Sequence, residues 1–151
     1  YKKSKIKEKL IFLGTTDKPS DEKNLLKIKK MITDLMLNKN ITFKGFVPNP
    51  YPWIKNAKAL ILSSKHEALP TVLIESLILQ TQTVSTNCPV GPSEILVDNL
   101  SQFLSPVGDS DALANNIKHA IENPLVITDK HIEKFNVDVI AKKYVQLAMQ
   151  N

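Results

Sequence analysis

Short apolar runs alternate with amphipathic segments of helical periodicity along this 151-residue chain, and this alternation constrains the fold more than any other feature. Strands are expected at residues 10–13, 41–43, 59–62, 83–86 and 102–104, and helices at 20–38, 53–56, 71–79, 93–97, 109–122 and 139–149. Strands that alternate with helices pair in parallel, and the helices cover the sheet. The sequence therefore predicts an α/β fold, a Rossmann-like parallel sheet with helices on both faces.

Local signals refine several of these elements. The run at 10–13 has the composition of a fully buried strand. Ser20 is expected to cap the next helix, with Asp21 and Glu22 in its first turn, and Ser93 is expected to cap a short helix through Val97. The length suits one domain with a real core, and we find no internal repeat or boundary, so residues 1–151 are predicted to form a single domain.

The positive charge of the chain comes from lysine alone. The formal net charge is +5, all 20 basic residues are lysines, and 42% of the residues are hydrophobic, which excludes general disorder. A sequence-specific nucleic-acid reader would be expected to use arginine, so no nucleic-acid partner is predicted. The lysine-rich residues 1–9 are either a solvated face or a segment attracted to anionic lipid, which would suit peripheral membrane association.

Targeting, redox and metal signals are missing from the sequence. No apolar run approaches the roughly 20 residues of a membrane-spanning helix, and residues 1–9 lack the apolar core of a signal peptide, which predicts a soluble, cytoplasmic protein. The single Cys88 has no partner for an internal disulfide, and the three histidines do not have zinc-ligand spacing. Metal and redox chemistry are not expected.

Seven residues separate Glu67 from Glu75 in a segment that reads as strand, polar loop and helix. Pro70 stands where a helix can begin, because proline has no N–H to lose in the first turn. This pattern places Glu67 in the loop after a strand and Glu75 about one turn into the helix. The backbone of Leu69, Pro70, Thr71 and Val72 at the helix start would form an anion site. Two carboxylates beside an anion site suit a phosphorylated, hydroxyl-rich ligand.

The segment Ser63-Ser64-Lys65-His66-Glu67-Ala68-Leu69-Pro70-Thr71-Val72-Leu73-Ile74-Glu75 resembles the signature of the retaining glycosyltransferases of family 4, which have the GT-B fold. The resemblance continues in Asn49-Pro50-Tyr51-Pro52 and in Cys88-Pro89-Val90-Gly91-Pro92-Ser93-Glu94-Ile95-Leu96, and it extends from about Leu10 to the C-terminus. One departure is Ala68, where the family usually has glycine. The family's donor-binding domain also opens with a strand and a glycine-rich turn that carries an arginine and a lysine, and we expect these elements to precede Tyr1.

The resemblance implies roles for individual residues. Glu75 would accept hydrogen bonds from the ribose hydroxyls of a nucleotide sugar, and Glu67, the candidate catalytic residue, would lie near the hydroxyls of the transferred sugar. The donor would further be bordered by His66, by the turn Gly91, Pro92, Ser93 and Glu94, and by Phe46, Val47 and Pro48 at the nucleobase. Plain alternatives remain: a helix-surface carboxylate for Glu75, a solvated carboxylate for Glu67, a capping or solvent contact for the Thr71 hydroxyl, a helix cap for Ser93, and polar surface for His66.

The family's activity would be transfer of a hexose from a nucleotide sugar, UDP-linked, to a glycan or lipid-linked acceptor with retention of configuration. The resemblance implies no metal, because helix dipoles and cationic side chains would neutralise the diphosphate. It implies that an N-terminal acceptor-binding domain is the partner, so this chain alone would bind donor weakly and catalyse little or nothing. Two alternatives stay open: a non-catalytic nucleotide-binding or interaction module, and a nucleotide-sugar epimerase of the same architecture.

Overall fold

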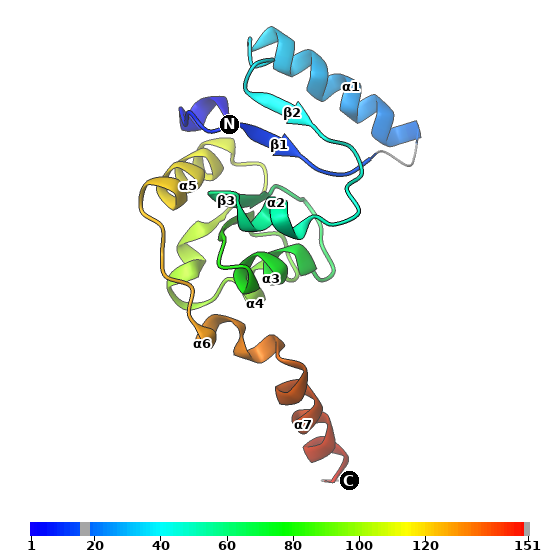
Figure 1. Ribbon diagram of the computed structural model, residues 1–151, viewed down its shortest axis with the longest axis vertical. Helices are drawn as coiled ribbons and strands as arrows, with labels where there is room; N and C mark the ends of the chain where they lie inside the picture. Colours follow the sequence, from blue (N-terminus) through cyan, green and yellow to red (C-terminus); the bar gives the residue numbers. More distant parts are fainter. Residues whose placement is uncertain (16–18, 150–151) are drawn as a thin grey trace. The chain divides into compact units, whose positions relative to one another are not determined.

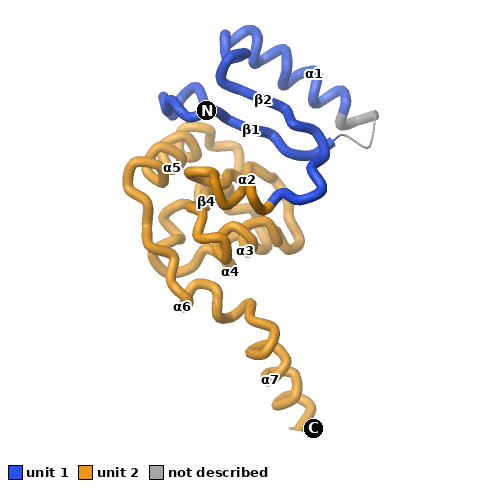
Figure 2. The backbone as a smooth tube through the Cα atoms, in the orientation of Figure 1, with its two compact units in different colours: residues 1–50 blue, residues 51–151 orange. Residues whose placement is uncertain are grey.

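The computed structural model describes residues 1–15 and 19–149, with the backbone alone at 19–21. The chain divides into two compact units, Tyr1–Pro50 and Tyr51–Asn151 (Figure 2). The division falls in the proline-rich segment 48–52, and each unit is built on its own parallel sheet. The predicted α/β class with parallel strands is confirmed. That residues 1–151 act as one donor-binding domain stays a prediction.

The first unit contains a two-stranded parallel sheet and one long helix (Figure 1). Its elements are η1 (Lys2–Ser4), β1 (Leu10–Phe12), α1 (Pro19–Asp34) and β2 (Ile41–Phe43). The register pairs Leu10 with Ile41 and Phe12 with Phe43, whose rings stack with centroids 4.9 Å apart. Helix α1 ends four residues before the predicted Asn38, because Met36 adopts a left-handed backbone at φ 58°. The expected roles of the Ser20 and Asp21 side chains lie outside the described residues.

The prediction that residues 10–13 form a fully buried strand is wrong. Ile11 is 41% exposed and Phe12 is 38% exposed. The physical reason is the size of the sheet: β1 pairs with a single neighbour, β2, and two strands with one helix provide too little cover to bury both faces. Within the described part of the first unit, Ile32 is the one hydrophobic residue that reaches the buried class, at 8% exposure.

The second unit contains a three-stranded parallel sheet in the order β3-β4-β5, made of β3 (Ala59–Leu62), β4 (Gln82–Thr86) and β5 (Leu104–Ser105). Its helices are α2 (Tyr51–Lys55), α3 (Thr71–Ile78), α4 (Pro92–Ile95), η2 (Asp98–Phe103), α5 (Ser110–Glu122), α6 (Asp129–Ile132), η3 (Glu133–Phe135) and α7 (Val137–Ala148). Every residue of β4 is buried, which requires cover on both faces of the strand, and both α3 and α5 pack against it. Helices on both faces are thus confirmed for this sheet.

The hydrophobic core lies in the second unit, between α3, α4 and η2. Six buried side chains form it: Leu73, Leu77, Ile95, Leu96, Leu100 and Ile127. Each such side chain contributes about 1.5–3 kcal/mol of burial free energy. Helix α7 extends away from the sheet of its own unit (Figure 1). No helix in residues 1–15 and 19–149 is both long and apolar enough to cross a bilayer.

Two local predictions in the second unit are wrong. The expected strand at 102–104 is mostly the η2 turn, and β5 begins only at Leu104. The side chains of Ser101 and Gln102 donate to the backbone carbonyls of Asp98 and Asn99, and such local bonds stabilise a turn at the expense of a strand. Ser93 does not cap α4, because Gly91 occupies the N-cap and Pro92 the first helical position.

Candidate functional site

Two loops at the carboxyl end of the β3-β4-β5 sheet contact each other through Gly91 and Pro70. A Cβ placed on Gly91 would lie 2.4 Å from Cδ of Pro70, and the Gly91 backbone has φ +96°. Only glycine fits this position without strain, for both steric and conformational reasons. The structure therefore brings together the loop after β3, with Glu67, and the loop after β4, with the Gly91 turn, as expected for a ligand site of an open α/β sheet.

The loop after β3 is tied to the neighbouring strand. The hydroxyl of Thr86, the last residue of β4, donates to the carbonyl oxygen of Ser64 at 2.5 Å. Beyond this anchor, His66 is exposed and Glu67 is half-buried. The Glu67 carboxylate is thus accessible from solvent while its backbone belongs to a fixed loop, an arrangement suited to binding a polar ligand.

Helix α3 begins at Thr71 with Pro70 as its N-cap, φ −76°. A proline side chain cannot accept hydrogen bonds from the first-turn N–H groups, so the start of α3 has no side-chain cap of the usual kind. Leu69 is 59% exposed and Thr71 is exposed, whereas Pro70 is buried. The positive end of the helix dipole therefore faces an accessible surface, which favours an anion such as a diphosphate.

Glu75 lies four residues after Thr71 on the same side of α3. It is half-buried, while its neighbours Ser76 and Leu77 are fully buried. Glu75 thus lies at the edge of the apolar side of the helix. A carboxylate in that position retains access to a ligand lying along the start of the helix.

The loop after β4 presents the Gly91 turn. The N–H of Asn87 donates to the carbonyl of Ser105 at 2.7 Å, which fixes the beginning of the loop on β5. Pro92 is buried, whereas Ser93 and Glu94 are exposed. Lys134 Nζ donates to the Glu94 carbonyl, and burial lowers the pKa of Lys134. A cation held under α4 thus fastens the turn to the η3 segment.

An open hollow of about 610 Å³ lies between the ends of the three strands. It is lined by Lys65, His66, Asn87, Pro89, Leu104, Ser105, Pro106 and Val107. His66 is the one predicted site residue in this lining. Sequence reasoning missed Lys65 and Asn87, which the fold brings together from two strand ends. Their sequence signal was weak, although Lys65 stands two residues before Glu67 and supplies a cation beside it.

Phe46, Val47 and Pro48 belong to the first unit and follow β2. Gly45 turns the chain there with φ +70°, and the N–H of Gly14 donates to its carbonyl at 2.8 Å. Phe46 is 72% exposed. Its exposed ring is available for stacking, but its role at a nucleobase stays a prediction.

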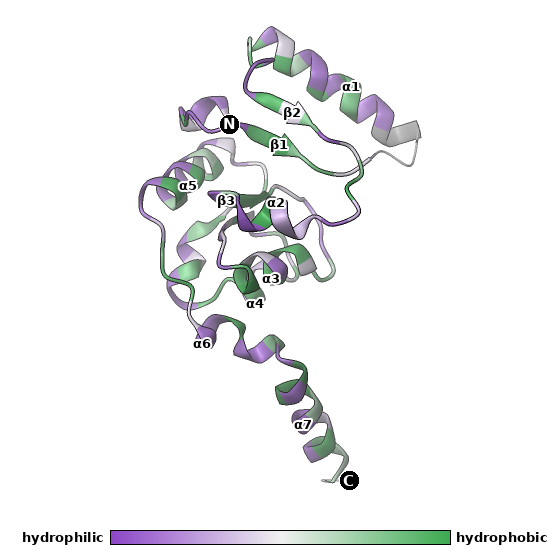
Figure 3. Cartoon of the chain, in the orientation of Figure 1, coloured by the Kyte–Doolittle hydropathy of each residue, from purple (hydrophilic) through white to green (hydrophobic). Residues whose placement is uncertain are grey.

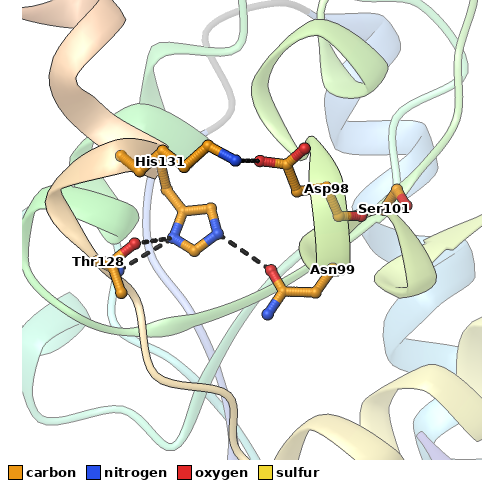
Figure 4. A network of polar contacts seen from close by, with 6 residues as sticks. Asp98, Asn99, Ser101, Thr128 and His131 are labelled. Atoms are coloured by element: carbon orange, nitrogen blue, oxygen red, sulfur yellow. Dashed lines mark hydrogen bonds and ion pairs between the residues drawn. The ribbon is translucent and has the colours of Figure 1, made fainter.

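A buried histidine, His131, connects the start of α6 to η2 (Figure 4). The N–H of Thr128 donates to Nδ1 of His131 at 3.0 Å, and Nε2 of His131 lies 3.0 Å from Oδ1 of Asn99. Because Nδ1 accepts, a neutral ring must carry its proton on Nε2 and donate to Asn99. Next to it, Lys130 forms a 2.9 Å ion pair with Asp98. This network joins α6 to η2 and has a structural function.

The model of one protein family, described as glycosyl transferases group 1, matches residues 1–137. The chain belongs to this family. The resemblance to the C-terminal domain of these enzymes, predicted from the motifs around Glu67 and Gly91, is confirmed.

Known relatives agree with this assignment. The chain is 37% identical over 93 residues to an uncharacterised glycosyltransferase of Methanocaldococcus jannaschii, covering 62% of this chain and 21% of the relative. It is 26% identical over 128 residues to the poly(ribitol-phosphate) alpha-N-acetylglucosaminyltransferase of Staphylococcus aureus, covering 80% of this chain and 26% of that enzyme. The chain thus spans about a quarter of the length of these relatives.

Solved structures show the same fold. HepE of Anabaena, in complex with UDP, superposes with a TM-score of 0.81 at 20% identity, covering 95% of this chain and 41% of HepE. The lipopolysaccharide outer core galactosyltransferase WaaB superposes with a TM-score of 0.77 at 18% identity, covering 94% of this chain and 40% of WaaB. The α/β fold with parallel strands therefore corresponds to one half of a GT-B fold.

Proposed function

We propose that this chain is the donor-binding domain of a retaining hexosyltransferase that uses a nucleotide sugar, most simply a UDP-sugar. The contact between Gly91 and Pro70 carries the proposal, because it brings two strand-to-helix turns to one site. The family membership and the UDP in the HepE complex support the choice of donor. Residues 1–151 would act as one domain in this role.

The donor would be bound by groups with different chemistry. The diphosphate suits the start of α3, which has no side-chain cap, so that the backbone of residues 69–72 and the helix dipole attract an anion. Lys65 adds a positive charge at the adjoining hollow. Glu75 is assigned to the ribose hydroxyls, since a half-buried carboxylate accepts strong charge-assisted hydrogen bonds.

The transferred hexose is assigned to the other carboxylate and to the second turn. Glu67 is accessible in a fixed loop and would accept hydrogen bonds from sugar hydroxyls, with His66 as a donor beside it. Gly91, Pro92, Ser93 and Glu94 would border the same sugar. Neutralisation of the leaving diphosphate by α3 and lysine needs no metal ion in this scheme.

The remaining parts of the reaction lie outside this chain. The acceptor, a glycan or a lipid-linked glycan, would be bound by an N-terminal domain, and the reaction would take place on the cytoplasmic side. The chain by itself is therefore expected to bind donor weakly and to show little or no transfer.

The donor site is tested by titrating ¹⁵N-labelled chain with UDP and with uridine. We expect UDP to shift the amide resonances of residues 69–72 and 91–94, and uridine to leave residues 69–72 nearly unchanged because it lacks the diphosphate. Shifts confined to other parts of the chain would refute the site.

The roles of the two carboxylates are tested in the full-length enzyme. Glu75→Ala should weaken UDP binding by about 1–3 kcal/mol, the range for lost hydrogen bonds to a charged group. Glu67→Ala should leave UDP affinity nearly intact and lower kcat. Glu122→Ala, in α5, is the matched control and should change neither quantity. Equal losses of UDP affinity in Glu67→Ala and Glu75→Ala would contradict this division.

A further inference from the structure

Formal charge is divided unevenly between the two units. Residues 1–50 hold 12 of the 20 lysines and five of the 15 acidic residues, a formal charge of +7, whereas residues 51–151 carry −2. The basic character of the chain therefore belongs to the first unit. A charge of this density attracts anionic surfaces over roughly one Debye length, about 8–10 Å in physiological salt.

Helix α1 gathers part of this charge on one face. Lys23, Lys27 and Lys30 recur at intervals of four and three residues, which places them on the same side of the helix. All three are exposed. Ile32, nine residues after Lys23 and hence on the opposite side of the helix, is buried. The lysine face of α1, defined by these three residues, is therefore turned to solvent.

Exposed apolar side chains border the lysine face. Leu26 is 66% exposed and Met31 is 60% exposed, and helical geometry places them on either side of the three lysines. Figure 3 shows hydrophilic and hydrophobic residues mixed along α1. When a helix lies on a bilayer, its lysines meet lipid phosphates while apolar side chains beside them enter the headgroup region.

Acidic residues do not cancel this charge. Helix α1 carries four lysines against three carboxylates, those of Asp21, Glu22 and Asp34. Asp34 stands four residues after Lys30, which places it at the C-terminal end of the lysine face itself. Residues 1–9 add five lysines against one glutamate. The lysine face thus has three lysines against one carboxylate, and the first unit as a whole keeps a formal charge of +7.

We propose that the lysine face of α1, with Leu26 and Met31 beside it, docks on an anionic lipid bilayer. Nucleic acid fits the surface less well, since the chain has no arginine for bidentate contacts. A phosphate backbone also offers no apolar surface that the exposed side chains of Leu26 and Met31 could contact. Docking does not depend on the proposed transferase function. If that function also holds, the surface would bring the donor domain to an acceptor carried on lipid.

The test is co-sedimentation of the 151-residue chain with vesicles of phosphatidylcholine containing about 30% phosphatidylglycerol, a source of surface charge. Each lysine near such a surface contributes about a fivefold factor in partitioning, so K23Q/K27Q/K30Q should bind about a hundredfold more weakly. L26Q should bind severalfold more weakly to vesicles while its binding to duplex DNA is unchanged.

The matched control is K55Q/K142Q/K143Q, which removes three exposed lysines from the second unit. It should keep most of the vesicle binding, and circular dichroism should confirm that both triple variants are folded. Should the lysine-face variant fail to fold, K23Q and K27Q singly, each with about a fivefold loss, replace it. The proposal is overturned if both triple variants lose binding equally, if vesicles of phosphatidylcholine alone bind as well, or if duplex DNA binds more tightly at equal phosphate concentration.

Discussion

Gly91 illustrates how a single residue can hold two loops of a site together. Its backbone lies against the Pro70 ring, with an added Cβ only 2.4 Å from Cδ, and its φ of +96° is outside the range that other residues adopt readily. The motif around Gly91 was visible in the sequence, but its contact with Pro70 was not, because 20 residues lie between the two positions. Lys65 and Asn87 went unrecognised for the same reason, since a shared hollow is a property of the folded sheet.

Gly91→Ala should therefore destabilise the chain by about 2–6 kcal/mol, combining about 1–3 of backbone strain and about 1–3 of overpacking. Gly108→Ala is the control, because Gly108 also has positive φ, +85°, but nothing lies within 4 Å of its added Cβ. It should show the strain part alone. The midpoints of urea unfolding measure the stability of both variants. Equal losses of stability in Gly91→Ala and Gly108→Ala would contradict a specific clash at Gly91.

A double variant separates the two parts of this effect. Pro70→Ala removes the ring atoms that the new Cβ would meet, so Pro70→Ala combined with Gly91→Ala should recover the overpacking part and keep the strain. Strict additivity of the two single changes would show that the loops do not press on each other at this point.

At the scale of elements, the sequence predicted regular segments well and turns poorly. The bounds of β2 and β3 agree with their short apolar runs, although none of their residues is fully buried. The extent of α5 agrees with its helical periodicity, because one face of that helix is buried through Ala114, Ile117 and Ala120. The η2 turn was mistaken for a strand. Its conformation is set by hydrogen bonds from the side chains of Ser101 and Gln102 to the backbone and by the left-handed backbone of Asp98 at φ 53°. Hydrophobic periodicity carries no information about such interactions.

The stability that the ion pair between Asp98 of η2 and Lys130 of α6 contributes should depend on pH. The hydrogen bond from Lys130, followed by the charge of Lys130, lowers the pKa of Asp98. A carboxyl group whose folded pKa is lowered contributes stability above its unfolded pKa, about 3.9, and this contribution is lost as the pH falls through the folded value. Thermal unfolding between about pH 6 and pH 2 should therefore show a loss of stability that Asp98→Asn reduces.

The control for this measurement is Glu122→Gln, which removes a carboxylate 3.8 Å from Lys118 in α5. Asparagine tolerates the left-handed backbone at position 98, so Asp98→Asn changes the charge without adding strain. Parallel pH profiles for wild type and Asp98→Asn would show that the ion pair with Lys130 makes no contribution.

At the scale of the whole molecule, apolar burial is distributed as unevenly as charge. Of the 14 hydrophobic residues that are buried in the described part of the chain, 13 belong to the second unit and Ile32 alone to the first. The sequence suggested one evenly covered sheet, because the composition of residues 10–13 matches that of a buried strand. Burial depends on how many elements surround a strand, and that number is fixed only by the assembled structure.

The first unit should therefore open at lower free energy than the second. Backbone amides in β1 and β2 are held by a sheet of two strands with exposed faces, whereas those in β4 are covered on both sides. Local stability follows apolar contact density, so hydrogen–deuterium exchange should be faster in residues 10–12 and 41–43 than in 82–86 and in α3. Leu73→Ala should speed exchange throughout the second unit and leave 10–12 and 41–43 unchanged, whereas equal protection of β1 and β4 would mean that both units unfold as one.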